Sequence, residues 1–312
     1  MSLQTASPDL LPLPAAQAQP NAGPKRIGLI AGWGDFPMLL AKRLHELGYE
    51  IYCVGVAGHY NPEIEQYCKV LKSFGLGRMG AQVRFLRRHG VQSAAMAGKI
   101  FKTLLFKRWA LLRHRPDWLT MRHFFHHFVS GRKNRNDDSL LLAVTGLFRQ
   151  HGITMLPATT LAPELLVRDG LLTGRPITSL QWRDIAFGWH LAKEMGRLDI
   201  GQSVAVKGRA VLAVEAIEGT DECIRRAGQL CPAGGFTVVK VAKPSQDMRF
   251  DVPTVGLGTI QTMRAVGARV LAIESEKTII LNPDEMLALA NSAGISVIAV
   301  NQDSLQQQAF AA

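Results

Sequence analysis

An apolar strand that runs directly into a glycine turn and an amphipathic helix opens the structured part of this chain. Residues 26–31 (RIGLIA) form a continuous apolar run of strand length, and apolar residues recur at helical spacing over residues 36–47. The alternation continues through further strands at 51–56, 70–73 and 94–97 and a further helix at 79–89. Successive parallel strands need a crossover connection, usually a helix, so this pattern predicts a Rossmann-like parallel sheet.

The C-terminal half shows a second and less uniform alternation. Residues 203–207 and 210–214 are apolar segments on either side of Gly208, which predicts a hairpin. Further helices are predicted at 185–195, 220–229, 259–265 and 283–291, and further strands at 236–241, 270–273, 278–281 and 295–300. This half is therefore predicted to be a distinct mixed α/β domain.

Changes in composition divide the chain. Residues 1–24 are rich in Pro, Ala and Gln and predict a disordered leader, without the charged start and apolar stretch of a secretory signal. The polar, basic run at 130–137 marks the predicted domain boundary, and the turn at 173–176 is the alternative. The predicted units are an N-terminal Rossmann-like domain (25–135), a C-terminal catalytic domain (136–302) and a frayed tail (303–312).

The net charge of +11 indicates a negatively charged partner. Lys and Arg are concentrated between Arg78 and Arg135, so the candidate partners are nucleic acid, an anionic membrane surface or a negatively charged substrate. No apolar run approaches the roughly 20 residues that cross a bilayer. The four cysteines have no metal-site spacing, which favours reduced thiols in the cytoplasm.

Three glycines, Gly28, Gly32 and Gly34, surround the end of the first strand and precede Asp35. Glycines at this position let the backbone approach a phosphate, and the amides of the following helix can bind it. The spacing is not GxGxxG, and no acidic residue ends the second strand, which disfavours NAD. We interpret Gly32, Gly34 and Asp35 as a candidate phosphate or nucleotide site; a tight strand-to-helix turn is the alternative.

A basic, aromatic segment spans residues 101–135 and is split by Pro116 into two predicted helices. Such helices suit a membrane surface or the acyl chains and phosphates of a lipid. Nucleic-acid binding and a core-packing helix pair with a solvated basic face are the alternatives. At the end of the segment, Asp137 and Asp138 offer carboxylates for Mg²⁺, unless Asp138 only caps a helix over 139–151.

Acidic residues gather where the second strand of the predicted hairpin turns into a helix. Glu215 follows an apolar run, and Glu218 and Asp221 flank Gly219, which permits a sharp turn. Crowded carboxylates are costly unless a cation, a base or a substrate offsets them. The segment is therefore a candidate catalytic site; the alternative is that Asp221 only caps the helix.

A polar loop follows the predicted strand at 236–241. It carries two cations, Lys243 and Arg249, together with Gln246 and Asp247. The cations could neutralise a diphosphate, which Arg can bind in bidentate fashion. A solvated loop is the alternative.

Five segments occur in order: GLIAG (28–32), DDSLL (137–141), GQSV (201–204), EAIEGTD (215–221) and KVAKPSQDMRFD (240–251). Together they resemble the UDP-2,3-diacylglucosamine pyrophosphatases of the LpxI type, from lipid A biosynthesis, and the resemblance runs from about residue 26 to 301. The chain departs from the family pattern at Trp33, where a small residue is more usual, and in its proline-rich leader.

The resemblance implies a lipid held between two α/β domains, Mg²⁺ as cofactor, and cleavage to UMP and 2,3-diacylglucosamine 1-phosphate (lipid X). It also implies that Asp221 is the essential aspartate. We hypothesise that Asp221 binds Mg²⁺ or orients the attacking water, that Glu218 assists as a metal ligand or from beside it, and that Lys243 and Arg249 hold the phosphates. The other residues expected to bind substrate are Gly32, Gly34, Asp35, Asp138, Gln202, Thr220, Gln246 and Asp247.

The expected partners are a UDP-linked diacyl sugar and the inner membrane surface, which a cytoplasmic protein would contact peripherally. We expect no nucleic-acid partner, and a homo-oligomer is left open. Three alternative functions remain at this stage: another nucleotide-sugar or phosphate-ester hydrolase, a lipid-binding protein without turnover, and a nucleic-acid-binding module. The enzyme readings predict release of UMP, whereas nucleic-acid binding would weaken steeply with salt and tolerate loss of Asp221.

Overall fold

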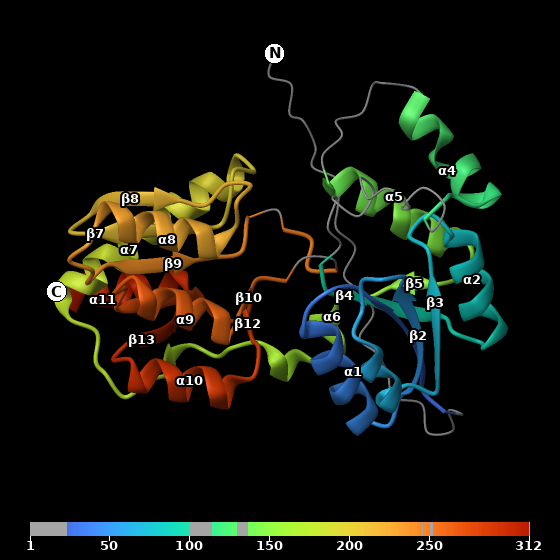
Figure 1. Ribbon diagram of the computed structural model, residues 1–312, viewed down its shortest axis with the longest axis horizontal. Helices are drawn as coiled ribbons and strands as arrows, with labels where there is room; N and C mark the ends of the chain where they lie inside the picture. Colours follow the sequence, from blue (N-terminus) through green and yellow to red (C-terminus); the bar gives the residue numbers. More distant parts are fainter. Residues whose placement is uncertain (1–23, 100–113, 130–136, 245, 250–251, 312) are drawn as a thin grey trace, which may run out of the picture.

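The computed structural model describes residues 24–99, 114–129, 137–244, 246–249 and 252–311 (Figure 1). Side chains are described for the same residues except 125–129, 137–140 and 309–311. The leader predicted for 1–24 lies outside the described residues but for its last one, as do the first helix expected in the basic segment and the loop at 130–136. No helix in the described part of the chain is long and apolar enough to cross a bilayer.

The N-terminal sheet has five parallel strands in the order β3-β2-β1-β4-β5. They are β1 (Arg26–Ala31), β2 (Glu50–Val56), β3 (Val70–Phe74), β4 (Ser93–Ala97) and β5 (Thr154–Met155). The strand order reverses between β1 and β4, and ligands of open α/β sheets bind outside the carboxyl ends of the strands at such a point. The predicted Rossmann-like parallel sheet is confirmed.

Helices cover both faces of this sheet because successive β1 side chains point to opposite sides. Leu29 packs with Leu40 and Leu44 on one face, and Ile30 packs in a cluster with Leu86 on the other. The helical elements are α1 (Phe36–Glu46), η1 (Pro62–Tyr67), α2 (Met79–Arg88), α4 (Trp118–Val129), α5 (Asp137–Gln150), α6 (Ala158–Leu161) and η3 (Pro163–Leu165).

The C-terminal sheet is mixed, with six strands in the order β6-β13-β11-β9-β7-β8. They are β6 (Gly170–Leu171), β7 (Ser203–Lys207), β8 (Ala210–Val214), β9 (Thr237–Lys240), β11 (Val270–Glu274) and β13 (Ser296–Val300). Strands β9, β11 and β13 are parallel, while β7 runs antiparallel to both β8 and β9. The carboxyl ends of β8, β9, β11 and β13 therefore meet the amino end of β7 at one edge.

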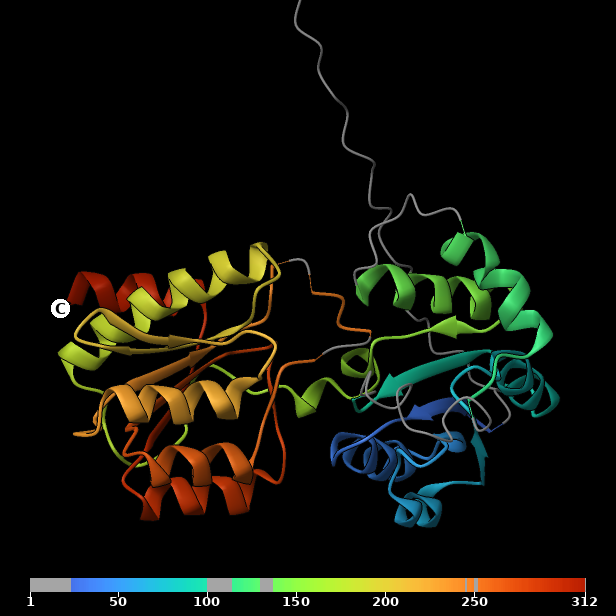
Figure 2. The ribbon, with the colours of Figure 1, turned by 45° about the horizontal axis from the view of Figure 1, so that its top comes forward.

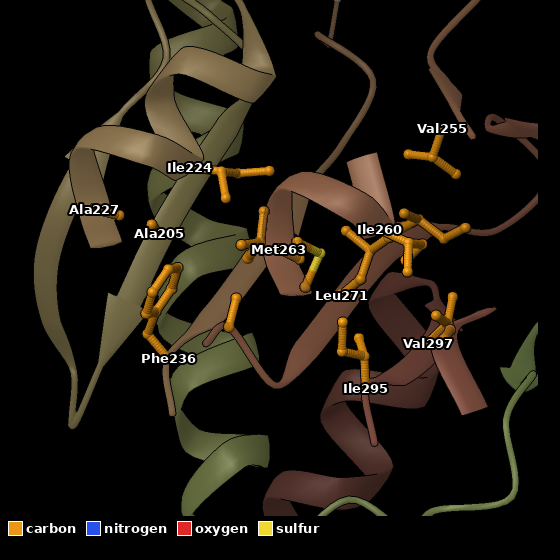
Figure 3. Close-up of a cluster of buried hydrophobic side chains, with 14 of the residues drawn as sticks. Ala205, Ile224, Ala227, Phe236, Val255, Ile260, Met263, Leu271, Ile295 and Val297 are labelled. Atoms are coloured by element: carbon orange, nitrogen blue, oxygen red, sulfur yellow. The ribbon is translucent and has the colours of Figure 1, made fainter. Parts of the chain in front are cut away.

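Two helical layers sandwich this sheet, with α7 and α11 on one face and α8, α9 and α10 on the other (Figure 2). Their bounds are α7 (Ser179–Arg197), α8 (Thr220–Leu230), α9 (Leu257–Ala265), α10 (Pro283–Ser292) and α11 (Gln302–Ala311). Figure 3 shows the core under α8 and α9, where Ile224, Met263 and Leu271 meet. This arrangement confirms the predicted distinct C-terminal α/β domain.

The boundary between the two domains lies further along the chain than predicted. Strand β5 pairs in parallel with β4, and Phe148 of α5 is buried in the same core as Ile153. The segment from 137 to 155 thus completes the N-terminal sheet, so the boundary predicted between residues 135 and 136 is wrong. A basic polar run resembles a linker in composition, but here the chain after it still supplies an edge strand and its covering helix.

Three helix ends also differ from the predictions. The tail predicted to be frayed from residue 303 is helix α11, and Leu305 on it is buried against α7. Helix α5 begins at Asp137, so Asp138 lies within its first turn rather than at the N-cap. Helix α7 begins at residue 179, because Thr178 and Gln181 form a capping box.

The two halves meet through apolar contacts beside a short two-stranded sheet of the C-terminal half, β10 (Thr254–Val255) with β12 (Ile279–Ile280). Val252 and Ile279, from the C-terminal half, are buried in the same cluster as Leu40 of α1. Leu166, just after η3, forms a bridge with Ile279. The loop that leaves β9 therefore contacts both cores.

Substitution of two helical glycines, Gly228 on α8 and Gly258 on α9, tests how tightly these helices pack. A Cβ on Gly228 would lie 2.4 Å from Cβ of Val266, whereas a Cβ on Gly258 would meet nothing within 4 Å. We expect Gly228→Ala to lower the free energy of unfolding by about 1–3 kcal/mol through overpacking. As the matched control, Gly258→Ala should raise it by up to about 1 kcal/mol through helix propensity. Urea denaturation measures both, and equal effects of the two substitutions would contradict the described packing.

Candidate active site

The carboxyl edge of the C-terminal sheet carries an unusual number of buried polar groups. Glu215 directly follows β8, Lys240 ends β9 and Glu274 ends β11, and each is at most 7% exposed. Ser203 begins the neighbouring strand β7 and is also buried. Burying charge is costly unless it is paired, so the partners of these groups define what the edge can do.

Helix α8 starts at this edge through a turn that only glycine adopts easily. Gly219 is the N-cap residue, with φ 86° and ψ 169°, and supplies no side-chain cap. The turn predicted at Gly219 is thus confirmed. Thr220 and Asp221 occupy the first turn of the helix and are partly exposed. A helix amino terminus favours anions such as phosphate, so the Asp221 carboxylate lies where a phosphorylated ligand would also be stabilised.

The hydroxyl of Thr220 is the centre of a hydrogen-bond network whose other members are buried. It donates to Oε1 of Glu215 at 3.0 Å and accepts from Nζ of Lys240 at 3.1 Å. Its oxygen also lies 3.3 Å from Oγ of Ser203. Because a hydroxyl has one proton, and that proton goes to Glu215, Ser203 must be the donor in the third bond.

Glu215 leaves part of its hydrogen-bonding capacity unused. Its Oε2 is buried and has no hydrogen-bond partner among the described residues. Burial, and then the negative charge of Glu215, raise the pKa of the nearby Cys223 thiol to about 12. The amino-terminal part of α8 thus packs over a locally anionic site.

Glu218 is engaged by an arginine of the same helix region. Its Oε1 lies 2.5 Å from Nη2 of Arg226, and the same nitrogen donates to the carbonyl of Val214 at 2.6 Å. Glu218 therefore braces the loop between β8 and α8. Glu222, one residue beyond Asp221, is exposed and pairs with Arg225.

The loop after β9 holds the other predicted substrate-binding residues. Nζ of Lys243 lies 2.5 Å from Oδ1 of Asp199, and its backbone amide donates to Oε1 of Gln246 at 2.8 Å. Arg249 binds both oxygens of Asp247, at 2.8 Å and 2.5 Å, and these hydrogen bonds hold the pKa of the Asp247 carboxyl below its usual value. Both predicted phosphate-binding cations are thus paired with acids.

A buried ion pair anchors the start of that loop. Nζ of Lys193 on α7 lies 2.6 Å from Oε2 of Glu274 and donates to the carbonyl of Ala242 at 3.0 Å. The amide of Ala242 donates back to Oε2 of Glu274 at 2.7 Å. Burial lowers the pKa of Lys193, against the opposing effect of Glu274. The pair fixes how the chain leaves β9.

The glycine turn of the N-terminal sheet is a separate feature. The amides of Gly32 and Trp33 donate to the carbonyls of Ala97 and Lys99, and a Cβ on Gly32 would lie 2.8 Å from the Lys99 oxygen. Gly32 therefore serves a close backbone approach, and its amide is already used. Gly34, with φ 102° and open space around it, precedes Asp35 at the start of α1. Gly34 and Asp35 lie at the point of the N-terminal sheet where the strand order reverses.

The structure brings some predicted residues together and leaves others apart. Gln202 and Thr220 lie at the same edge as Glu215, and Oε1 of Gln202 has no hydrogen-bond partner among the described residues. Gly34 and Asp35 belong to the other sheet, and the side chain of Asp138 lies outside the described residues.

Sequence reasoning missed the buried partners of Thr220. Lys240 lies in the predicted strand at 236–241 and was not predicted as a site residue, although a lysine that ends a buried strand needs a partner within the fold. Ser203 gave no signal, since an isolated serine at the start of a strand is common. Glu215 was noticed as an acid after an apolar run but was not selected as a site residue. The pairing of β7 with both β8 and β9 brings these three side chains to one point.

A divalent cation fits this edge only if the substrate supplies most of its ligands. No three His, Cys, Asp or Glu side chains in the described ranges gather closely enough to enclose a metal. Mg²⁺ is usually held by one or two carboxylates, waters and substrate phosphates. Asp221, which makes no ion pair with another described residue, suits that role, whereas Glu218 already pairs with Arg226.

Comparisons with known proteins cover nearly the whole described chain. The LpxI N-terminal domain model matches residues 26–165, and the LpxI C-terminal domain model matches residues 168–298. The chain is also similar to UDP-2,3-diacylglucosamine pyrophosphatase LpxI of Caulobacter vibrioides, with 29% identity over 288 residues, 89% of this chain and 98% of that protein. The junction between the two models falls at residues 166–167, next to the bridge between Leu166 and Ile279.

Proposed function

The chain belongs to the LpxI family, and on that premise we propose that it hydrolyses the diphosphate of UDP-2,3-diacylglucosamine in lipid A biosynthesis. The products are UMP and 2,3-diacylglucosamine 1-phosphate. A water oxygen bonds to one phosphorus, the bond from that phosphorus to the bridging oxygen breaks, and the proton of the water is released to the site. The observation that carries the proposal is the position of Asp221 at the carboxyl edge of the C-terminal sheet, in a chain that matches both LpxI domains.

Asp221 is the catalytic residue in this proposal. A diphosphate in water carries negative charge that repels a nucleophile, so catalysis needs charge neutralisation and a positioned water. The carboxylate of Asp221 orients that water, and the amide dipoles of α8 favour a phosphate beside it. Glu218 contributes through Arg226, by holding the loop that precedes the helix.

Mg²⁺ is the proposed cofactor, and Asp221 is the residue that would hold it, together with the diphosphate. The ion would supply charge neutralisation to the phosphoryl oxygens. The scarcity of clustered carboxylates in the described residues supports a cation that arrives with substrate rather than one enclosed by protein.

Lys243 and Arg249 are the proposed phosphate-binding cations, with Gln202, Gln246 and Asp247 beside them. Each cation is paired with an acid, so a phosphate would compete with Asp199 for Lys243 and with Asp247 for Arg249. An exposed single-contact ion pair such as Lys243–Asp199 is worth about 0–1 kcal/mol, whereas the bidentate Arg249–Asp247 pair is the stronger competitor.

We also propose that the protein works in the cytoplasm at the inner membrane surface, because its substrate carries two acyl chains. Support comes from α4, where Trp118 is 76% exposed and Met121 52% exposed, with Arg115 and Arg122 exposed beside them. Leu142 on α5 is also 52% exposed, and a contact between His123 and the Ala143 carbonyl joins the two helices. Exposed Trp flanked by Arg is typical of an anionic membrane interface.

Replacing Asp221 tests the proposed function. We expect Asp221→Asn to lower kcat for UMP release from UDP-2,3-diacylglucosamine at least 100-fold, about 2.7 kcal/mol of barrier, because the amide neither orients water as a base nor holds Mg²⁺. The assay quantifies UMP with Mg²⁺ present and again with excess EDTA, which should abolish release until Mg²⁺ is restored.

The matched control is Asp284→Asn, which alters an exposed aspartate in the first turn of another helix of the same domain. It should retain wild-type turnover. An Asp221→Asn protein that keeps activity within tenfold of wild type would rule out the assignment, and turnover that is insensitive to EDTA would rule out the metal.

Membrane contact is tested by cosedimentation with vesicles of phosphatidylethanolamine and phosphatidylglycerol. We expect the double substitution Trp118→Ser, Met121→Ser to reduce the bound fraction at least fivefold, because it removes the apolar contact area. Vesicles of phosphatidylcholine alone should bind the wild type weakly, since they offer no negative charge to Arg115 and Arg122.

Leu180→Ser is the control, since Leu180 is 72% exposed on α7 of the other domain. A loss of binding as large in the control as in the double variant would refute the proposed surface. So would a wild type that does not sediment with the anionic vesicles.

A further inference from the structure

The turn that carries Asp221 has no side-chain cap of its own. Gly219 has a left-handed φ and no side chain, no residue lies within 4 Å of where its Cβ would be, and α8 has no side-chain N-cap. Glycine is tolerated at an N-cap, but it supplies no side-chain acceptor for the free amides of the first turn. The Glu218–Arg226 pair holds the loop before the turn, and the side chains that contact the first helical residue come from neighbouring strands.

Lys240 is placed to supply that restraint. Alternation along β9 puts Val239 against α7 and Val238 against α8, so Lys240 faces the α8 side. Its side chain is 7% exposed, and its ammonium donates to the hydroxyl of Thr220 at 3.1 Å and to the carbonyl of Thr254 at 2.9 Å. It thus ties the end of β9 to the start of α8 and to β10.

Glu215 completes the arrangement from the opposite side. The Thr220 hydroxyl accepts from the ammonium of Lys240 and donates to the carboxylate of Glu215, so one hydroxyl links a buried cation to a buried anion. Hydrogen bonds to charged groups are about twice as strong as neutral ones. The donor of Thr220 is used and its oxygen accepts two bonds, which fixes the rotamer of the residue adjacent to Asp221.

We infer that Lys240, Thr220 and Glu215 are positioning residues, which hold the first turn of α8, and with it Asp221, in one orientation for the reaction. The inference rests on the proposed function for its consequence in turnover. Its structural content is independent of that function: Ser203 of β7, Glu215 after β8 and Lys240 of β9 all contact one hydroxyl, and Lys240 also joins β10. It also gives Thr220 a role within the protein in place of the direct substrate contact expected from the sequence.

Two substitutions test the inference. Lys240→Met removes the ammonium but keeps the side-chain length, and Thr220→Val removes the hydroxyl but keeps the shape. For each we expect kcat to fall at least 20-fold while KM stays within threefold of wild type, because orientation of Asp221 is lost and substrate contacts are kept. Thr220→Ser, which restores the hydroxyl, should recover most of the turnover lost in Thr220→Val.

Hydrogen exchange supplies a readout that does not depend on activity. The amide of Cys223 donates to the carbonyl of Gly219 at 3.2 Å and closes the first turn of α8. We expect this turn to exchange at least tenfold faster in Lys240→Met and in Thr220→Val than in wild type. The control is Lys207→Met, which removes another lysine that donates to a carbonyl, that of Gly234, at the opposite edge of the same sheet. It should change neither kcat nor the exchange of this turn.

The outcomes separate the inference from the proposed function. If the wild type releases UMP and both variants keep kcat within threefold of it, the inference is overturned and the function stands. If the wild type releases no UMP, the function is overturned, and unchanged exchange of the α8 turn in the variants would overturn the inference as well. Should Lys240→Met fail to fold, Glu215→Gln carries the same test, with an expected fall in kcat of at least fivefold.

Discussion

The structure of the candidate site depends on burying charge at the carboxyl edge of the C-terminal sheet. An isolated buried charge costs several kcal/mol, so Lys240, Glu215, Lys193 and Glu274 are tolerable only as partners. Their pairings cross from strand to helix rather than along one element. As a result the same contacts that satisfy the charges also set where α8 begins and where the chain leaves β9.

This edge also explains how two α/β units form one protein. The loop that leaves β9 passes the buried Lys193–Glu274 pair and then packs Val252 into the core around α1. Antiparallel bridging of Leu166 with Ile279 adds a second connection. The carboxyl edge of the C-terminal sheet is therefore only a few residues along the chain from the contacts between the two halves. A substrate that touched both halves would have to lie near these contacts.

The fold was largely predictable from the sequence, because the spacing of apolar residues indicates which face of a strand or helix is buried. The opening strand, the glycine at residue 219 and the hairpin at Gly208 were predicted within a residue or two. The two-residue strand β5 was not predicted, since so short a segment has no measurable periodicity and is defined only by pairing with β4. The capping box at Thr178 was present in the sequence and could have extended the predicted helix.

The candidate site was predictable in its location but not in its pairing. Acids and bases could be seen in the sequence, yet which acid meets which base depends on tertiary contacts: Lys243 pairs with Asp199 and Glu218 with Arg226. These pairs are partly exposed and therefore weak, whereas the partners of Thr220 are buried and costly to leave unpaired. The site thus combines a hydrogen-bond network that holds the helical turn of Asp221 with cations that can exchange one anion for another. The proposed reaction needs that combination, because the substrate would have to displace carboxylates from the cations without disturbing Asp221, the residue proposed to orient the water.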